Sequence, residues 1–191
     1  TTVGSIGSST GQLKVTSSTR SYLFGTSNFF GLHDNVLDLG SLTYRWDDVY
    51  ATNGTIQTSD RNEKEAIASL TPTEMLVAAR LSSSFKNFKW KDAVAEKGAA
   101  ARMHSGIIAQ DVQDAFTAEG LDAGDYSMFI SGTWWEHEGT TYETLEEAPE
   151  GATERTRLGV RYPELLAFVA AYNDQRFISI ETRLAALEAT P

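Results

Sequence analysis

The sequence predicts an α+β fold in two parts: a strand-rich segment over residues 1–58, and a mixed segment over residues 59–191 that ends in one long helix. Three observations support this prediction. Short β-like runs separated by Gly, Ser and Asn fill the first part. Helical and strand-like patterns alternate in the second part, and residues 164–190 contain neither Gly nor Pro.

Composition excludes several classes of function. The 191 residues are 41% hydrophobic and 22% charged, which is ordinary for a globular protein. A net charge of −10 without a local Lys/Arg cluster predicts that nucleic acid is not a partner. No apolar run reaches membrane-spanning length, so we expect no membrane insertion. The start at Thr-Thr-Val is typical of a segment cut from a longer protein.

Metal and cofactor chemistry has no support in the sequence. The chain has no cysteine, which excludes disulfides and thiolate metal sites. The three histidines, His33, His104 and His137, lack the spacing of metal ligands. We therefore expect neither a metal site nor a cofactor.

The strand-rich part is too poor in apolar residues to build a core easily by itself. We therefore expect other copies of the chain to complete it. Between its strands, Tyr44–Ala51 is predicted to form a helical turn in which Trp46 and Tyr50, four residues apart, pack together. The predicted strands are Gln12–Thr16, Ser21–Gly25, Val36–Leu39 and Thr55–Thr58.

The second part opens with a clear helix signal. Thr71-Pro72-Thr73-Glu74 combines a capping threonine, a proline at the first helical position and a glutamate that completes a capping box. This helix is predicted to end at Ser82-Ser83-Ser84, and Phe85–Trp90 to form a strand. Residues 92–101 are predicted to be a loose exposed connection. Residues 104–112 are predicted to be a short strand that runs into a helix ending near Phe116.

Residues 125–158 have the weakest pattern. Met128–Ile130 and Thr133–Glu136 are predicted to be strands of a hairpin. Trp134-Trp135-Glu136-His137 could form a ligand platform, but an exposed hairpin with a cross-strand aromatic pair is favoured. Residues 143–154 are acidic and rich in turn residues. We assign this region no function.

The long helix, predicted over residues 163–189, carries an apolar stripe. Seven positions recur at alternating spacings of four and three, which predicts a coiled-coil seam over roughly three heptads. The alternative is an amphipathic helix that lies on its own domain. Asn173 favours the seam, because a buried polar residue fixes register and strand number. The stripe consists of Leu166, Ala170, Asn173, Phe177, Ile180, Leu184 and Leu187.

A possible nucleophile and base lie at the junction of the two parts. Ser59 is followed five residues later by Lys64, and a neutral lysine can remove the proton of a serine hydroxyl. The alternative is that Ser59 or Asp60 caps a helix, with Asp60 and Glu63 spaced as a capping box. Five residues of regular helix leave two side chains about 140° apart. Ser59 must therefore precede the helix, or the lysine must come from a neighbouring subunit.

Several motifs taken in order resemble the C-terminal intramolecular chaperone of phage tail spikes and tail fibres, the self-cleaving domain of the endosialidase type. The resemblance extends over residues 39–190, except for 125–157, which match no part of the family and are expected to be a variable insertion. The matching motifs are Leu39-Gly40-Ser41, Tyr44-Arg45-Trp46, Val49-Tyr50, Ser59-Asp60 with Lys64 and Ile67, Leu81 with Phe88-Lys89-Trp90, Gly106–Val112 and Gly159–Tyr162.

The resemblance implies a specific fold and function. Residues 1–58 would be the end of an intertwined β-structured fibre, and residues 59–191 a chaperone that forms a homotrimer and folds that upstream segment. The chaperone would then cut itself off between Thr58 and Ser59. The fibre part would stay in the virion tail, and the chaperone would be released into the host cytoplasm.

The resemblance also implies residue roles. Ser59 would be the nucleophile and Lys64 its base, with Asp60 in support and His104 tied to cleavage. One departure bears on the mechanism, because Glu63 stands where the family often has an apolar residue, and Glu65 follows. Nearby carboxylates favour the charged form of a lysine unless they point into solvent.

Two other functions fit the sequence less well. A trimeric adhesin tip that does not cleave itself would use Ser59 only as a cap. A glycan-degrading enzyme has little support, since the sequence does not show which carboxylates would pair.

Overall fold

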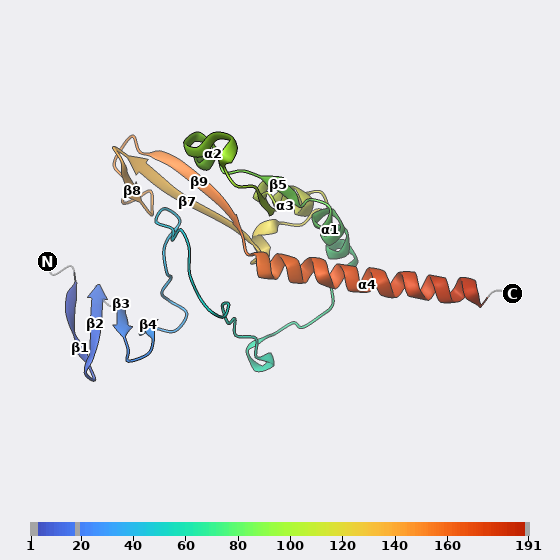
Figure 1. The fold of residues 1–191 in the computed structure, drawn as a ribbon, viewed down its shortest axis with the longest axis horizontal. Coiled ribbons are helices and arrows are strands. Elements are labelled where there is room, and N and C mark those ends of the chain that lie inside the picture. Colours follow the sequence, from blue (N-terminus) through green and yellow to red (C-terminus); the bar gives the residue numbers. More distant parts are fainter. Residues whose placement is uncertain (1–3, 18–19, 190–191) are drawn as a thin grey trace. The chain divides into compact units, whose positions relative to one another are not determined.

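The structure is a computed structural model that describes residues 4–17 and 20–189. The chain divides into two compact units, Thr1–Gly54 and Thr55–Pro191, which are described separately below (Figure 1). Among the described residues, no helix is both long and apolar enough to cross a membrane. The α+β prediction with a long C-terminal helix is confirmed.

The first unit is an antiparallel sheet whose strands follow one another in sequence order. Two predicted strands are confirmed, because β2 and β3 occupy Gln12–Ser17 and Arg20–Phe24. Leu23, at 4% exposed, is the one buried hydrophobic side chain in the described part of this unit. The expected shortage of core residues is therefore real. The outer strands are β1 (Ser5–Ser9) and β4 (Phe29–Gly31).

The rest of the first unit is irregular, so the strand at Val36–Leu39 and the helical turn at Tyr44–Ala51 were wrong predictions. A turn at Ser41 replaces them: its N–H donates to the Tyr44 carbonyl at 2.9 Å, and the Tyr44 N–H donates to Ser41 Oγ at 3.0 Å. Local side-chain hydrogen bonds of this kind compete with helix formation. Tyr50 is left 95% exposed.

The core of the second unit lies between three helices, α1 (Pro72–Ser82), α3 (Ala109–Thr117) and α4 (Tyr162–Glu188). Each helix turns one apolar stripe toward the others, which is how amphipathic helices form a common core. The largest fully buried side chains come from all three helices: Val77, Leu81, Val112, Phe116 and Leu165.

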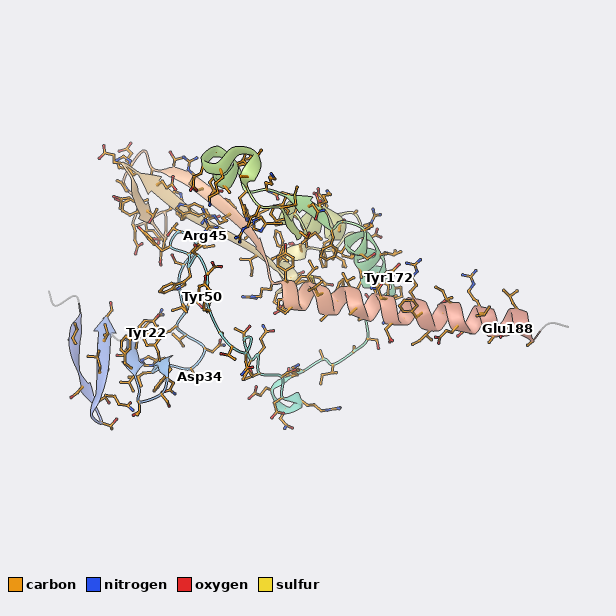
Figure 2. All side chains as sticks on the ribbon, in the orientation of Figure 1. Tyr22, Asp34, Arg45, Tyr50, Tyr172 and Glu188 are labelled. Atoms are coloured by element: carbon orange, nitrogen blue, oxygen red, sulfur yellow. The ribbon has the colours of Figure 1, made fainter. Side chains whose placement is uncertain are left out.

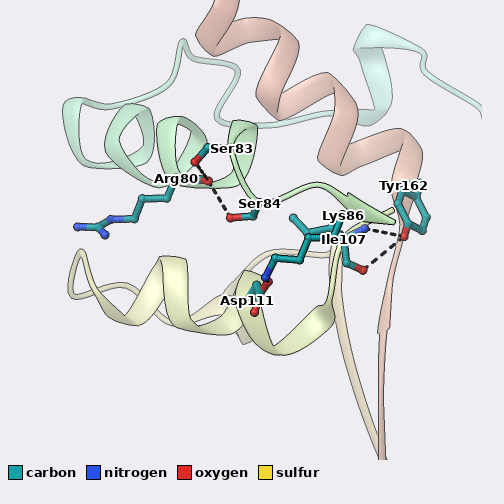
Figure 3. A network of polar contacts seen from close by, with 7 residues as sticks. All are labelled: Arg80, Ser83, Ser84, Lys86, Ile107, Asp111 and Tyr162. Carbon is teal, nitrogen blue, oxygen red and sulfur yellow. Dashed lines mark hydrogen bonds and ion pairs between the residues drawn. The ribbon is translucent and has the colours of Figure 1, made fainter. Parts of the chain in front are cut away.

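Helix α1 begins and ends as predicted. Thr71 and Glu74 form the reciprocal capping box, with the Glu74 N–H donating to Thr71 Oγ1 at 3.2 Å and the Thr71 N–H donating to a Glu74 carboxylate oxygen at 2.6 Å. These bonds lower the pKa of Glu74. At the other end, the hydroxyls of Ser83 and Ser84 both donate to the Arg80 carbonyl, each at 2.9 Å (Figure 3).

Both strands predicted after α1 are present as β5 (Lys86–Phe88) and β6 (His104–Gly106), and the structure shows that they pair in an antiparallel sheet. The predicted loose connection between these strands was wrong. It contains helix α2 (Lys91–Lys97), which ends at Gly98 with φ +56°. Alanine, lysine and glutamate favour a helix, and glycine ends one readily. The segment is exposed, as expected, because none of the α2 residues is buried.

The predicted hairpin strands at Met128–Ile130 and Thr133–Glu136 were also wrong as separate strands. They lie in one continuous strand, β7 (Phe129–His137), which pairs with β8 (Thr140–Tyr142) on one side and β9 (Thr153–Val160) on the other. The tight turn comes later, at Glu138-Gly139, where both residues have positive φ. Positive φ at both central residues suits the twist of a two-residue hairpin.

Trp134 on β7 is buried, whereas Trp135 lies opposite Tyr142 on β8, which is a cross-strand aromatic pair. The Trp134 ring is 8% exposed and lies 5.0 Å from the guanidinium carbon of Arg157, a cation–π contact with β9. Its ring N–H donates to Glu136, and together with Arg155 this bond lowers the pKa of Glu136. The segment predicted to be an insertion therefore forms an ordered part of this unit.

Helix α4 follows β9 and runs for 27 residues, in agreement with the predicted long helix. Its buried residues, Leu165, Phe168 and Val169, all lie in its first eight positions. Beyond Tyr172 the helix extends past the other elements of its unit toward Glu188, with its side chains projecting outward (Figure 2).

The predicted seam is a different face of α4 from the one that packs on its own unit. At about 100° per residue, the centres of the two faces lie roughly 100° apart around the axis. Phe177 is 63% exposed and Leu187 is 73% exposed, and Leu166, Ile180 and Leu184 are exposed as well. The alternative prediction, a helix that lies along its own domain, therefore describes only the first turns.

Candidate functional site

The backbone around Ser59 turns sharply at a single point. Residues 55–60 form no strand, so the strand predicted at Thr55–Thr58 was wrong. A 3₁₀ turn follows at Arg61–Glu63, capped by Asp60, whose Oδ1 accepts from the Asn62 N–H at 2.9 Å. The chain returns to an extended conformation at Lys64, with φ −123° and ψ 141°.

This turn brings the side chain of Lys64 back to Ser59. Lys64 Nζ donates a hydrogen bond to Ser59 Oγ at 2.6 Å. Of the two arrangements that helix geometry allowed, the chain adopts the one in which Ser59 precedes the helical turn and the lysine comes from the same chain. The expected capping role also exists, since Asp60 caps the turn through Asn62.

The two carboxylates beside Lys64 do not pair with it. Among the described residues, neither Glu63 nor Glu65 forms an ion pair with the lysine. Both side chains are exposed. Their charges are therefore screened by solvent, and the hydrogen-bond partner of Lys64 Nζ is Ser59 Oγ.

A cavity of about 460 Å³ opens beside the serine and lysine. One wall is the extended segment with the serine and lysine, and the other is the start of α4. Ser59 and Lys64 are both exposed in the single chain. A hydroxyl within hydrogen-bond reach of an amine is the geometry that nucleophilic catalysis by serine needs. The lining residues are Gln57, Thr58, Ser59, Lys64, Pro163, Glu164 and Ala167.

His104 does not line this cavity. It lies on β6 opposite Phe88, with its ring stacked on the Phe88 ring at 5.9 Å and edge-on to Trp90 at 6.2 Å. The single chain thus brings Ser59 and Lys64 together, but not His104. A role for His104 in cleavage stays a prediction.

The start of α4 is held in place by Tyr162. Its hydroxyl accepts a hydrogen bond from the Ile107 N–H at 3.1 Å, at the junction of β6 and α3 (Figure 3). A Cβ on Gly106 would lie 2.3 Å from that hydroxyl oxygen, so only glycine leaves room for it. Beside this contact, Lys86 and Asp111 form an ion pair with 2.5 Å between Nζ and Oδ2, which ties β5 to α3.

Sequence reasoning missed two residues of the site, Tyr162 as its anchor and Glu164 as part of its wall. Glu164 accepts a hydrogen bond from the Ser127 hydroxyl. A glycine within a short strand does signal close approach of another group, but the sequence does not say which group approaches. Among the described residues, no cluster of three His, Asp or Glu side chains could hold a metal ion.

Comparison with known proteins identifies the domain that carries this site. Residues 59–121 match the family model described as chaperone of endosialidase, and that match begins at Ser59. This part of the chain is similar to the chaperone domains of the endosialidase family. The resemblance read from the sequence motifs is confirmed.

Relatives of this chaperone domain are phage tail proteins. The tail spike protein of Escherichia virus K5 is 32% identical over 155 residues, 78% of this chain and 23% of the relative. The capsule K3-specific depolymerase 1 of Klebsiella phage KP32 is 40% identical over 95 residues, 50% of this chain and 11% of the relative. The chain thus spans less than a quarter of the length of these curated relatives.

The fold has a solved counterpart. The carboxy-terminal domain of the bacteriophage T5 L-shaped tail fibre, solved with its intramolecular chaperone domain, matches with a TM-score of 0.69. That match covers 91% of this chain and 45% of the T5 chain at 22% sequence identity. At this identity the likeness shows the fold: mixed α and β with a long terminal helix.

Replacing Gly106 tests the anchor. Gly106→Ala should lower stability by about 1–3 kcal/mol, the usual cost of overpacking, because the new methyl group collides with the Tyr162 hydroxyl. Adding Tyr162→Phe should recover part of the loss by removing the hydroxyl oxygen. Thermal unfolding followed by circular dichroism measures both effects.

Gly159→Ala is the matched control. It adds the same methyl group in a strand of the same unit, where the nearest atom, Cβ of Ile130, lies at an ordinary 3.6 Å. If Gly106→Ala unfolds at the same temperature as Gly159→Ala, Tyr162 does not constrain this position.

Proposed function

We propose that residues 59–191 are a trimeric folding chaperone for the fibre segment before them, and that they cut themselves off between Thr58 and Ser59. The observation that carries the proposal is the 2.6 Å hydrogen bond from Lys64 Nζ to Ser59 Oγ, at the first residue of the matched family domain. Similarity to the family supports the chaperone role. The geometry of the hydrogen bond supports the chemistry.

The proposed reaction has two balanced steps. Lys64 in its neutral form takes the proton of Ser59 Oγ, which attacks the carbonyl carbon of Thr58 through a five-membered ring. The Thr58–Ser59 C–N bond breaks, the nitrogen takes the proton from Lys64, and an ester joins Thr58 to Ser59 Oγ. Water then hydrolyses the ester, which leaves a carboxylate on Thr58 and a free hydroxyl and amine on Ser59.

Cleavage is expected to wait for assembly. A lysine side chain in water titrates near pH 10.4, so an exposed lysine is almost fully protonated at neutral pH and is no base. Ser59 and Lys64 are exposed in the single chain. Neighbouring chains that cover the cavity would desolvate the lysine and favour its neutral form. His104 from one of these chains is our candidate for a further group at the scissile bond.

The apolar surface of α4 supports a trimer. The stripe from Leu166 to Leu187 contains several large apolar side chains that stay exposed in the single chain. Burying each one against partner helices stabilises the assembly by about 1.5–3 kcal/mol. Asn173 lies on this stripe, where its side chain would fix the register of the helices.

The first unit fits the role of folding client. Its sheet lacks a core of its own, and Tyr44, Trp46, Val49 and Tyr50 are exposed. Strands that pair between chains form only after slow encounters, because the contacts are non-local. A trimer formed by the chaperone at the end of the chain raises the effective concentration of these strands. Later removal of the chaperone by cleavage leaves a kinetically stable fibre. The fibre part would belong to the virion tail, and the chaperone would be released in the host cytoplasm.

A second candidate is a trimeric tip that does not cleave itself. The Asp60 cap favours it, since capping alone accounts for the turn at Arg61–Glu63. One denaturing gel of the purified protein distinguishes the two functions, because only self-cleavage gives two fragments.

The first prediction concerns Ser59 and Lys64. After refolding, the wild type should yield a fragment that ends at Thr58, whereas Ser59→Ala and Lys64→Ala should stay largely uncut because each lacks one member of the pair. Lys64→Arg is the matched control for charge, since arginine keeps the cation but does not act as a base at neutral pH. Intact mass against time measures the reaction.

Two results would count against this assignment. An N-terminal fragment that ends elsewhere than Thr58 would show that Thr58–Ser59 is not the scissile bond. Unchanged cleavage in Ser59→Ala, or wild-type cleavage in Lys64→Arg, would remove the proposed chemistry.

His104→Ala tests the third residue. Its removal should slow cleavage while the protein still folds and assembles, because the ring lies on an exposed strand and not in the core. Circular dichroism and light scattering check folding and assembly beside the mass assay. A folded trimer that cleaves at the wild-type rate would remove His104 from the site.

The last prediction concerns the seam. Ile180→Asp should prevent stable trimers, because it buries an unpaired charge between the helices. Ser179→Asp makes the same change of charge one residue earlier, about 100° around the helix, and should still assemble. Light scattering at micromolar concentration reports the oligomeric state. A stable wild-type monomer, or normal assembly of Ile180→Asp, contradicts the seam.

A further inference from the structure

The wall of the cavity opposite Ser59 carries a carboxylate. Glu164 lies in the first turn of α4, directly after Pro163, and both residues line the cavity with Ser59 and Lys64. Proline and an acidic residue are both favoured in the first turn of a helix. Local helix chemistry therefore suffices to place a carboxylate at the start of α4, and there Glu164 lines the same cavity as Thr58 and Ser59.

The carboxylate of Glu164 is held in one orientation. The Ser127 hydroxyl donates to Glu164 Oε2, and the Ser127 carbonyl accepts from Arg161 Nη1 at 3.0 Å. The Arg161 N–H donates to the Met128 carbonyl at 2.9 Å, which joins the start of α4 to the residues before β7. Glu164 is only half-buried, so water reaches the cavity that it lines.

The proposed reaction leaves a role for such a group. In the ester intermediate the leaving oxygen is Ser59 Oγ, and Lys64 Nζ already donates a hydrogen bond to that atom. Lys64 is therefore placed to give a proton to the leaving oxygen. A different group has to take the proton from the attacking water, and a positioned carboxylate does so in many hydrolases.

We propose that Glu164 is the general base that activates water for hydrolysis of the Thr58–Ser59 ester, an inference that rests on the proposed self-cleavage. Water attacks the ester carbon and gives a proton to the Glu164 carboxylate. Lys64, which ester formation leaves neutral, has by then taken a proton from solvent. The bond from that carbon to Ser59 Oγ breaks, and Oγ takes this proton from the Lys64 ammonium. Glu164 releases its own proton to solvent, so one water is consumed and the two groups return to the carboxylate and the neutral amine.

The test separates ester formation from ester hydrolysis. Glu164→Gln keeps the side-chain shape and an oxygen that accepts from Ser127, but it removes the base. The ester should therefore form and accumulate, while release of the fragment ending at Thr58 slows on the order of 100-fold, as for loss of a general base.

Hydroxylamine reveals the ester. An ester has the same mass as the uncut chain, but alkaline hydroxylamine cleaves it and leaves a hydroxamate on Thr58. Fragment mass distinguishes this cut from the cut that hydroxylamine also makes at Asn53-Gly54. Refolded Glu164→Gln should therefore be uncut in buffer and cut by hydroxylamine at Thr58. Ser59→Ala should resist hydroxylamine at Thr58, because it cannot form the ester.

Glu181→Gln is the matched control. It removes one carboxylate from the same helix about 25 Å from Glu164, so it should cleave like the wild type. Glu164→Asp keeps the carboxylate but sets it back by one methylene, and should hydrolyse the ester slowly. Circular dichroism checks that each variant is folded. If Glu164→Gln does not fold, the rate of ester hydrolysis in Glu164→Asp is the test.

Two results overturn the inference. In one, folded Glu164→Gln, or Glu164→Asp in its place, releases the fragment at the wild-type rate. In the other, folded Glu164→Gln is neither cut in buffer nor cut by hydroxylamine at Thr58. Glu164 is then needed for formation of the ester and not for its hydrolysis. The proposed self-cleavage fails separately, when the wild type itself gives neither the fragment nor a hydroxylamine-sensitive bond at Thr58.

Discussion

The packing of the first two turns of α4 against α1 and α3 is the interaction on which the second unit depends. Leu165, Phe168 and Val169 enter the common core, and this fixes where α4 begins. The Tyr162 hydroxyl then fits against Gly106, and Glu164 faces the cavity at Ser59. The same contact that closes the core thus builds one wall of the site. A change that loosens it is expected to disturb folding and chemistry together.

A division between faces explains how one helix serves both the domain and its assembly. The packed face belongs to the first turns, and the apolar stripe that contains Phe177 and Ile180 lies at another angle and extends farther along the helix. Because the two faces do not compete, the domain can fold before its partners arrive. We propose that the exposed stripe then supplies the free energy for association into a trimer.

Sequence signals predicted those elements whose causes are local. The Thr71–Glu74 capping box and the uninterrupted run of α4 depend on residues within a few positions of one another, and both were predicted correctly. Tyr44–Ala51 failed because an aromatic pair at helical spacing does not outweigh a Ser41 turn. The hairpin failed because the turn lies at Glu138-Gly139, where a non-glycine residue adopts positive φ.

The site was predictable only in part, for a similar reason. Ser59 and Lys64 are near neighbours in sequence, so their contact needed only a turn between them. Tyr162 and Glu164 come from a helix about a hundred residues later and reach the site through the tertiary fold. No periodicity or spacing in the sequence connects them to Ser59. His104 was predicted from family resemblance, and the single chain leaves it among aromatic rings.

The position of α4 after every other described element has a consequence for biosynthesis. On a ribosome, the strands and the Ser59 segment emerge before α4. A polypeptide that terminates before α4 lacks the stripe from Leu166 to Leu187, which we propose is the seam of a trimer. With the stripe as the seam, the order of elements alone would exclude truncated chains from the finished fibre. No separate proofreading factor would then be needed.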